Sequence, residues 1–204
     1  MASEPMRDPI GDHLLTAQNV ALCVIDYQPS QFAGVKSMDS GLLLENIVST
    51  VKIAKAFELP IVHSTINVAT GRGQPTVPEL AELLEDNPPI DRTTTNAWED
   101  TEFRAAVRAT GRRKLIVCAL WTEICMAFPT LDALREGYEV YPVVDAIGGT
   151  SEEAHRAGVE RVVQAGAQPI TWVPFAVELQ RDWARTDTVD DVIEIVLTER
   201  LLKA

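Results

Sequence analysis

Cys125 is the residue of this chain whose surroundings best suit covalent chemistry. An apolar run, KLIVCAL at 114–120, leads through Trp121 into Thr122, where a helical pattern begins without an intervening glycine or proline. Thr122 is a good N-cap residue, which would place Cys125 at the third helical position, where unpaired amides and the helix dipole favour a thiolate. The same amides could hold an oxyanion that forms when the thiolate attacks a carbonyl carbon. The alternative is a small core side chain, because apolar residues surround Cys125 in the sequence.

The other two cysteines, Cys23 and Cys118, lie inside apolar runs. We expect both to be buried, because free cysteine is among the most buried residue types. An odd number of cysteines without CxxC spacing predicts neither a disulfide framework nor a structural zinc site. This usage is typical of a reducing compartment, so we expect a cytoplasmic protein.

Asp26 is the second candidate, because it ends the apolar run NVALCVID at 19–26. A carboxylate in such a place costs free energy unless it is paired or functional. It could accept the proton of a nearby thiol and later activate water. The alternative is an Asx turn that caps the following loop. First and fourth strands often lie side by side in parallel sheets, so Asp26 and Cys125 could meet.

The elements that would position these side chains alternate between strand-like and helix-like segments. Apolar strands joined by short connections indicate a parallel sheet covered by helices on both faces. We therefore predict an α/β fold, a three-layer α-β-α sandwich with a central, mostly parallel six-stranded sheet. In such a sheet ligands bind beyond the carboxyl ends of the strands. The expected strands are 19–26, 59–67, 88–96, 114–120, 138–147 and 168–173, and the expected helices are 42–59, 77–84, 99–110, 122–137, 150–167, 175–184 and 188–202.

The chain as a whole has the size of one domain. We expect an N-terminal arm at 1–17, which could pack on a neighbouring subunit, and a single domain at 18–204. The net charge is −12, from 30 acidic and 18 basic residues, which argues against nucleic acid or an anionic membrane as a partner. No apolar run is long enough to cross a bilayer, and acidic residues near the N-terminus argue against a secretory signal.

Several segments together resemble the isochorismatase-like cysteine hydrolases, and among them the YcaC-type hydrolases. The resemblance covers about residues 14–185 and rests on VIDYQ at 24–28, NAWEDTEF at 96–103, ALWTEICMAFPTLDALREGYEV at 119–140, VVDA at 143–146 and AGAQPITWVPFAVELQRDW at 165–183. It implies a parallel sheet between helices and an Asp–Lys–Cys triad, with Asp26 as the base and Cys125 as the nucleophile.

Arg92 stands where many members of this family carry the triad lysine. Arginine stays protonated and does not readily give up a proton, but it can hold a thiolate or a substrate carboxylate electrostatically. The alternative is a surface ion pair with Asp91 or Glu99. The resemblance also implies a non-proline cis peptide just before the motif threonine, at Trp121–Thr122.

The pocket walls are expected to come from the loops at 30–40 and 67–76 and from aromatic residues near the thiol. The expected substrate-binding residues are Phe32, Asn67, Trp98, Trp121 and Thr122. Trp98 could equally be a core aromatic. Related nicotinamidases bind zinc through one aspartate and two histidines, whereas the three histidines here, His13, His63 and His155, are isolated. We therefore expect neither a metal nor another cofactor.

These features predict a metal-independent cysteine hydrolase that acts on a small amide-like substrate through a thioester intermediate. One alternative is an isochorismatase-type enol-ether hydrolase, whose chemistry needs no cysteine. The other is a non-catalytic, oligomeric small-ligand-binding protein with a relic site. The resemblance to YcaC-type proteins further implies a homo-oligomer, with an octamer among the candidate assemblies.

Overall fold

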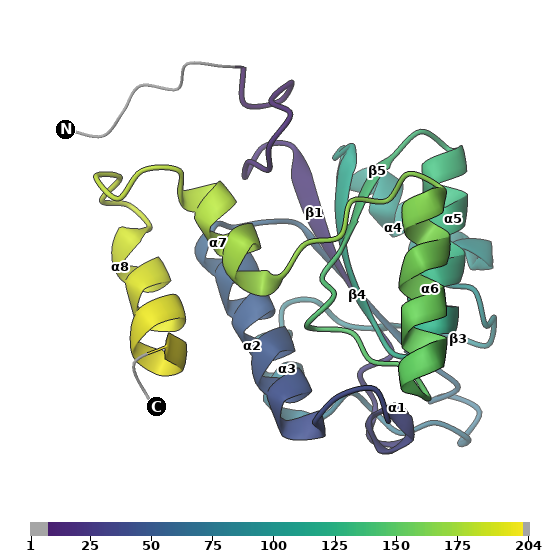
Figure 1. Cartoon of the computed structure of the whole chain (residues 1–204). Helices are drawn as coiled ribbons and strands as arrows, with labels where there is room; N and C mark the ends of the chain where they lie inside the picture. The colour runs from purple at the N-terminus through teal and green to yellow at the C-terminus, as the bar shows by residue number, and fades with distance from the viewer. Residues whose placement is uncertain (1–7, 202–204) are drawn as a thin grey trace.

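A five-stranded parallel sheet forms the centre of the protein in a computed structural model that describes residues 8–201 (Figure 1). The strand order is β3-β2-β1-β4-β5, and every neighbouring pair is parallel, as predicted. β1 lies at the centre, and the chain adds strands first on one side of it and then on the other. The strands are β1 (Val20–Ile25), β2 (Ile61–Ile66), β3 (Ile90–Arg92), β4 (Lys114–Ala119) and β5 (Glu139–Pro142).

Helices cover both faces of the sheet, which confirms the three-layer prediction (Figure 1). The helices of one face are α2 (Ser40–Ala56), α3 (Pro78–Leu83), α7 (Trp172–Gln180) and α8 (Val189–Val192), and those of the other are α4 (Thr101–Ala109), α5 (Ala127–Arg135) and α6 (Glu152–Gln164). Alternate strand residues serve the two layers, so Leu22 and Val24 belong to one apolar core and Cys23 and Ile25 to the other. A π-helical segment, η3 (Ile193–Leu201), continues α8.

A sixth strand was predicted at 168–173. This segment instead pairs with the chain after β5 at a single bridge, between Val143 and Ile170, so it is not a full strand. β5 stops at Pro142, which has no backbone N–H to donate to a ladder. α7 then begins at Trp172, whose N–H donates to Asp145 Oδ1 at 3.1 Å. The helix therefore takes over residues that a strand would need. A short helix, α1 (Pro29–Gly34), follows β1 where a loop was expected, with proline at its first position.

The described part of the predicted arm, residues 8–17, packs on its own domain. Lys114 Nζ donates to the carbonyls of Asp12 and His13 at 2.7 Å each, and the buried Leu15 donates its N–H to Glu178 at 2.9 Å. A role of this segment in a subunit contact stays a prediction, and residues 1–7 lie outside the described residues. Within the described part of the chain, no helix is long and apolar enough to cross a membrane.

Candidate active site

The carboxyl ends of three strands bring Asp26, Arg92 and Cys125 to one edge of the sheet. Asp26 directly follows β1 in a left-handed backbone conformation (φ 62°), and Arg92 is the last residue of β3. Cys125 lies in η2 (Thr122–Met126), a π-helical turn that follows β4. β1 and β4 are neighbours, as predicted, with Ile25 opposite Ala119. The chain reverses its direction of winding between these two strands, where ligands bind in open parallel sheets.

The ion pair between Arg92 and Asp26 is buried. Arg92 Nη2 donates to Asp26 Oδ2 at 2.6 Å, and neither side chain has any exposed surface. Arg92 therefore reaches across β2 to the end of β1, and it forms no surface pair with Asp91 or Glu99. The Asp26 carboxylate binds the guanidinium instead of capping the following loop. A charged pair without access to water depends on mutual compensation, because each charge alone would be strongly unfavourable there.

The Cys125 thiol lies against this ion pair. The Cys125 side chain is nearly buried, and its Sγ is 4.0 Å from the carbonyl oxygen of Thr95. Burial, then the charge and hydrogen bonding of Asp26, raise the pKa of Cys125, whereas Arg92 and the backbone N–H of Trp121 act to lower it. Burial likewise raises the pKa of Asp26, against the opposing effects of Arg92 and of the hydrogen bond with Cys125.

The helix end and Arg92 were expected to favour the thiolate of Cys125, but burial and Asp26 act in the opposite direction. Burial outweighs the favourable contacts, so Cys125 keeps its proton at neutral pH. The thiol and Asp26 are coupled groups, and the nucleophile can form when the proton passes from sulfur to Asp26 as substrate binds. Asp26 Oδ1, the carboxylate oxygen that Arg92 does not hold, is buried and has no hydrogen-bond partner among the described residues.

The turn that contains Cys125, η2, has its N-cap one residue earlier than predicted. Trp121 occupies the N-cap position without a side-chain cap bond, so Cys125 is the fourth helical residue. The hydroxyl of Thr122 instead hydrogen-bonds His155 Nδ1 at 2.8 Å, and its N–H donates to Gly148 at 2.9 Å. The cis peptide is Leu120–Trp121, which corrects the predicted Trp121–Thr122. No sequence signal connected His155 to this turn.

Three of the five buried side-chain atoms without a hydrogen-bond partner in the described structure lie at this site. They are Asp26 Oδ1, Arg92 Nε and Thr94 Oγ1. The loop that contains Thr94 is held by Arg92 Nη1, which donates to the Thr94 carbonyl at 3.0 Å. Native structures leave few buried polar groups unpaired, and such groups call for a functional explanation. Their concentration beside the thiol marks this edge as the place where a polar ligand would be accommodated.

The predicted pocket residues have different surroundings. Trp121 donates its indole N–H to Gln31 at 2.8 Å and packs where a Cβ on Gly34 would lie 2.4 Å from its ring. Phe32, in α1, contacts the ring of Tyr27 at a centroid distance of 5.9 Å. Asn67 follows β2 in a left-handed conformation, and its N–H donates to the Arg92 carbonyl at 2.8 Å. All these loops border the same edge of the sheet, and their contact with substrate stays a prediction.

Trp98 makes the contacts of a core aromatic. It is buried in the same apolar cluster as Cys125, with Tyr138 at 5.4 Å and Phe103 at 6.5 Å between ring centroids. Its indole N–H donates to Glu136 at 2.9 Å, toward the opposite edge of the sheet from the thiol. A direct role of Trp98 in substrate binding stays a prediction.

The histidines are occupied by protein contacts. Both ring nitrogens of His63 are hydrogen-bonded, to the Asn87 carbonyl at 3.1 Å and to Thr76 Oγ1 at 2.8 Å. Burial lowers the pKa of His63, so the ring is neutral at pH 7. Among residues 8–201, no three His, Cys, Asp or Glu side chains are grouped to hold a metal ion. Independence from metal stays a prediction.

Iodoacetamide at neutral pH is expected to modify Cys125 before Cys23 or Cys118. Cys125 is 7 % exposed against 2 % and 0 % for the other two, and of the three thiols it is the one beside Arg92. Burial raises the pKa of all three thiols, so the expected order rests on exposure and on the nearby guanidinium and not on the resting pKa. Labelling should still be slower than for a small free thiol, and Arg92→Ala should slow it further. Peptide mass spectrometry over time measures the order, and equal labelling of all three cysteines would contradict it.

Comparisons with known proteins find relatives over most of the chain. The model of the isochorismatase domain matches residues 20–173. The chain is 38 % identical to "Probable hydrolase YcaC" of Escherichia coli (strain K12) over 170 residues, which are 83 % of this chain and 81 % of the relative. Two solved structures are similar throughout. YcaC from Pseudomonas aeruginosa, with hexane-2,5-diol and covalent acrylamide, has TM-score 0.84 and 34 % identity, and covers 90 % of each chain. The Escherichia coli YcaC gene product, an octameric hydrolase of unknown specificity, has TM-score 0.85 and 33 % identity, and covers 96 % of this chain and 94 % of that one.

Proposed function

Since the chain belongs to the isochorismatase family of hydrolases, we propose that it is a metal-independent cysteine hydrolase that cleaves a small amide-like substrate through a thioester. The observation that carries the proposal is the juxtaposition of the Cys125 thiol with the buried Asp26–Arg92 pair. A thiol beside a base is the arrangement that nucleophilic acyl transfer uses, and a nearby cation offsets the charge of the thiolate. A thiol buried only for packing would need neither ionic group beside it.

The first half of the reaction forms the thioester. The proton on Cys125 Sγ passes to Asp26, and the sulfur attacks the carbonyl carbon of the amide, which gives a tetrahedral oxyanion. The Trp121 N–H, which acts to lower the pKa of Cys125, would donate to that oxyanion. The intermediate collapses as the C–N bond breaks, Asp26 returns its proton to the departing nitrogen, and an amine or ammonia leaves.

The second half consumes water. Asp26 takes a proton from a water molecule as its oxygen attacks the thioester carbonyl. The C–S bond then breaks, the acid leaves, and Cys125 regains the proton. Arg92 stays protonated throughout, because arginine does not act as a proton donor at neutral pH. Its role is to hold Asp26 in position and to offset negative charge as the thiolate forms.

The covalent ligand of one solved relative supports the proposal that Cys125 is a reactive nucleophile. The Pseudomonas aeruginosa structure holds covalent acrylamide, a small electrophilic amide with which thiolates react. The decisive experiment here is mass spectrometry of the intact protein after brief exposure to a panel of small amides, imides and ureides. We expect the mass of an acyl group on Cys125, lost again by hydrolysis. A substrate that turns over without any acyl-protein, under conditions that trap thioesters, would contradict the mechanism.

The acidic limb of the pH–rate profile is expected above the ordinary aspartate pKa. Asp26 must be ionised to accept the thiol proton, and burial raises the pKa of Asp26 from 3.8. Activity should therefore fall as the pH falls through that raised value, since the carboxyl is then already protonated. Measurement of kcat/KM between pH 4 and pH 8 tests this. A limb at or below the ordinary value would show that Asp26 is not the base.

Assembly is expected to be homo-oligomeric. The Escherichia coli relative is described as octameric, and three free cysteines suit a reducing cytoplasm as the place of assembly. Size-exclusion chromatography with light scattering should give a multiple of the 22.4 kDa chain mass at micromolar concentration. The mass of a single chain would refute the expectation.

A further inference from the structure

A concave site lies at the opposite edge of the sheet from Cys125. A cavity of about 390 Å³ is lined by Arg108, Gly111, Arg112, Arg113, Glu136, Gly137 and Tyr138. These residues come from the end of α4 and the loop before β4, and from the end of α5 and the loop before β5. β4 begins at Lys114 and ends before the catalytic turn, so the length of the strand separates the cavity from the thiol. The volume is that of a small-molecule site.

The walls of this cavity carry a surplus of positive charge. Glu136 is its one acidic lining residue, and both carboxylate oxygens are engaged, one by Arg108 Nη2 and one by the Trp98 indole, each at 2.9 Å. Arg113 Nη2 donates to the Gly137 carbonyl at 3.3 Å, and Arg112 Nη1 to the Gln18 carbonyl. Neither Arg112 nor Arg113 forms an ion pair with any of the side chains that the structure describes, those of residues 8–198.

The side chain of Arg112 includes one of the few buried donors that have no hydrogen-bond partner in the described structure. Its Nε is buried and has no hydrogen-bond partner. Two guanidinium groups without carboxylates are unexpected on a chain of net charge −12, where acidic partners are plentiful. Concave walls of one charge sign concentrate the electrostatic potential and attract counter-ions of the opposite sign. The planar guanidinium fork suits phosphate and carboxylate oxygens in particular.

We propose that this cavity binds a small anion with two or more phosphate or carboxylate groups. Arg112 and Arg113 supply the charge, and Arg108 contributes its remaining donors while Glu136 holds it in place. The cavity is too small for a polymer, and the overall negative charge of the chain opposes nucleic acid. The site is independent of the proposed hydrolase chemistry, because none of its residues belongs to the catalytic edge.

Isothermal titration calorimetry of the native, full-length protein tests the proposal. The probes are pyrophosphate and citrate, with sodium chloride at matched ionic strength as the reference. We expect saturable binding of at least one probe and a rise in the thermal unfolding midpoint with its concentration. Tighter binding of pyrophosphate would assign the site to phosphates, and tighter binding of citrate would assign it to carboxylates. Heats no larger than those of sodium chloride would overturn the proposal.

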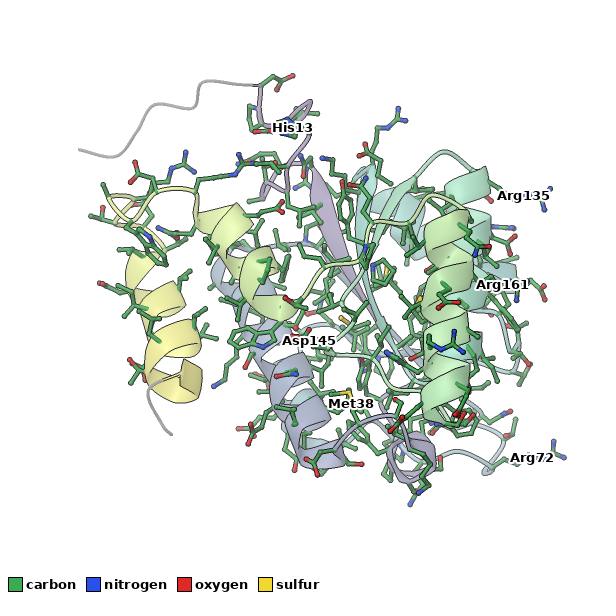
Figure 2. All side chains as sticks on the ribbon, viewed as in Figure 1. His13, Met38, Arg72, Arg135, Asp145 and Arg161 are labelled. Atoms are coloured by element: carbon green, nitrogen blue, oxygen red, sulfur yellow. The ribbon has the colours of Figure 1, made fainter. Side chains whose placement is uncertain are left out.

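Charge variants locate the binding. Arg113→Ala and Arg112→Ala should each weaken binding about 10- to 100-fold, the effect of losing a hydrogen bond to a charged group. Arg112→Ala loses the contact with Gln18 and could fail to fold for that reason. Arg113 is exposed, so Arg113→Ala should fold and tests the proposal by itself. The matched control is Arg72→Ala, because Arg72 is exposed and extends away from the body of the protein (Figure 2). Equal weakening in the control would reduce the effect to general electrostatics and contradict a built site.

Discussion

Replacing Cys125 by serine is expected to lower hydrolysis by at least about 1,000-fold, because removal of a catalytic nucleophile leaves only the contribution of binding and oxyanion stabilisation. Serine keeps the size of the side chain, but its hydroxyl is a far weaker acid than a thiol, and Asp26 is the only base beside it in the described structure. Initial rates with a substrate identified from the amide panel measure the effect. The acyl-protein mass should disappear in the same variant.

Cys23→Ala and Cys118→Ala are the matched controls for this prediction. Both thiols are buried within strands, on opposite faces of the sheet, and neither is among the groups that shift the pKa of Asp26. These variants should keep the turnover of the parent protein per folded molecule, although each loses some core packing. Undiminished turnover in Cys125→Ser would return Cys125 to a purely structural role and favour enol-ether chemistry, which needs no thiol.

Arg92→Met is expected to lower the free energy of unfolding by about 3–5 kcal/mol, the usual effect of removing one member of a buried ion pair. The loss arises because Asp26 would remain fully buried without the guanidinium at 2.6 Å. Urea unfolding at pH 7, with the slope of the transition compared between variants, measures it. The variant should also lose turnover, because Asp26 would take up a proton and cease to act as a base.

Two further variants separate charge from packing. Arg92→Lys keeps the positive charge and should recover part of the lost stability and of the activity. Arg156→Ala removes an exposed arginine that pairs with Glu160 at 3.0 Å one helical turn away, and it should leave stability almost unchanged. If Arg92→Met were as stable as Arg156→Ala, the Asp26–Arg92 contact would not be the compensated buried pair described here.

The sequence by itself predicted the architecture and the proximity of two candidate site residues. Apolar runs separated by helical periodicity predicted parallel strands, because a strand buried on both faces needs apolar residues at every position. The carboxyl ends of such strands share one edge, so Asp26 after the first strand and Cys125 after the fourth were expected to be close. Their neighbouring strands confirm that expectation.

Only the tertiary structure decided what these groups do to one another. The partner of Arg92 depends on a long side chain that crosses β2, and such reach leaves no trace in local sequence. The direction of the pKa shift of Cys125 depends on burial, which outweighs the nearby cation and amide. The Thr122–His155 contact joins residues 33 positions apart and replaces the predicted cap.

The difference between local sequence and tertiary contacts also explains the missing sixth strand and the cavity lined by Arg108, Arg112 and Arg113. Residues 168–173 have the composition of a strand, but Pro142 ends its pairing partner and Asp145 starts a helix at Trp172. The arginines at 108, 112 and 113 stand close together in the sequence, yet the cavity exists because β5 pairs beside β4 and brings Glu136 and Tyr138 opposite them. Local pattern determines which segments become strands and helices, whereas the contacts between distant segments determine which polar groups are paired, buried or left to meet a ligand.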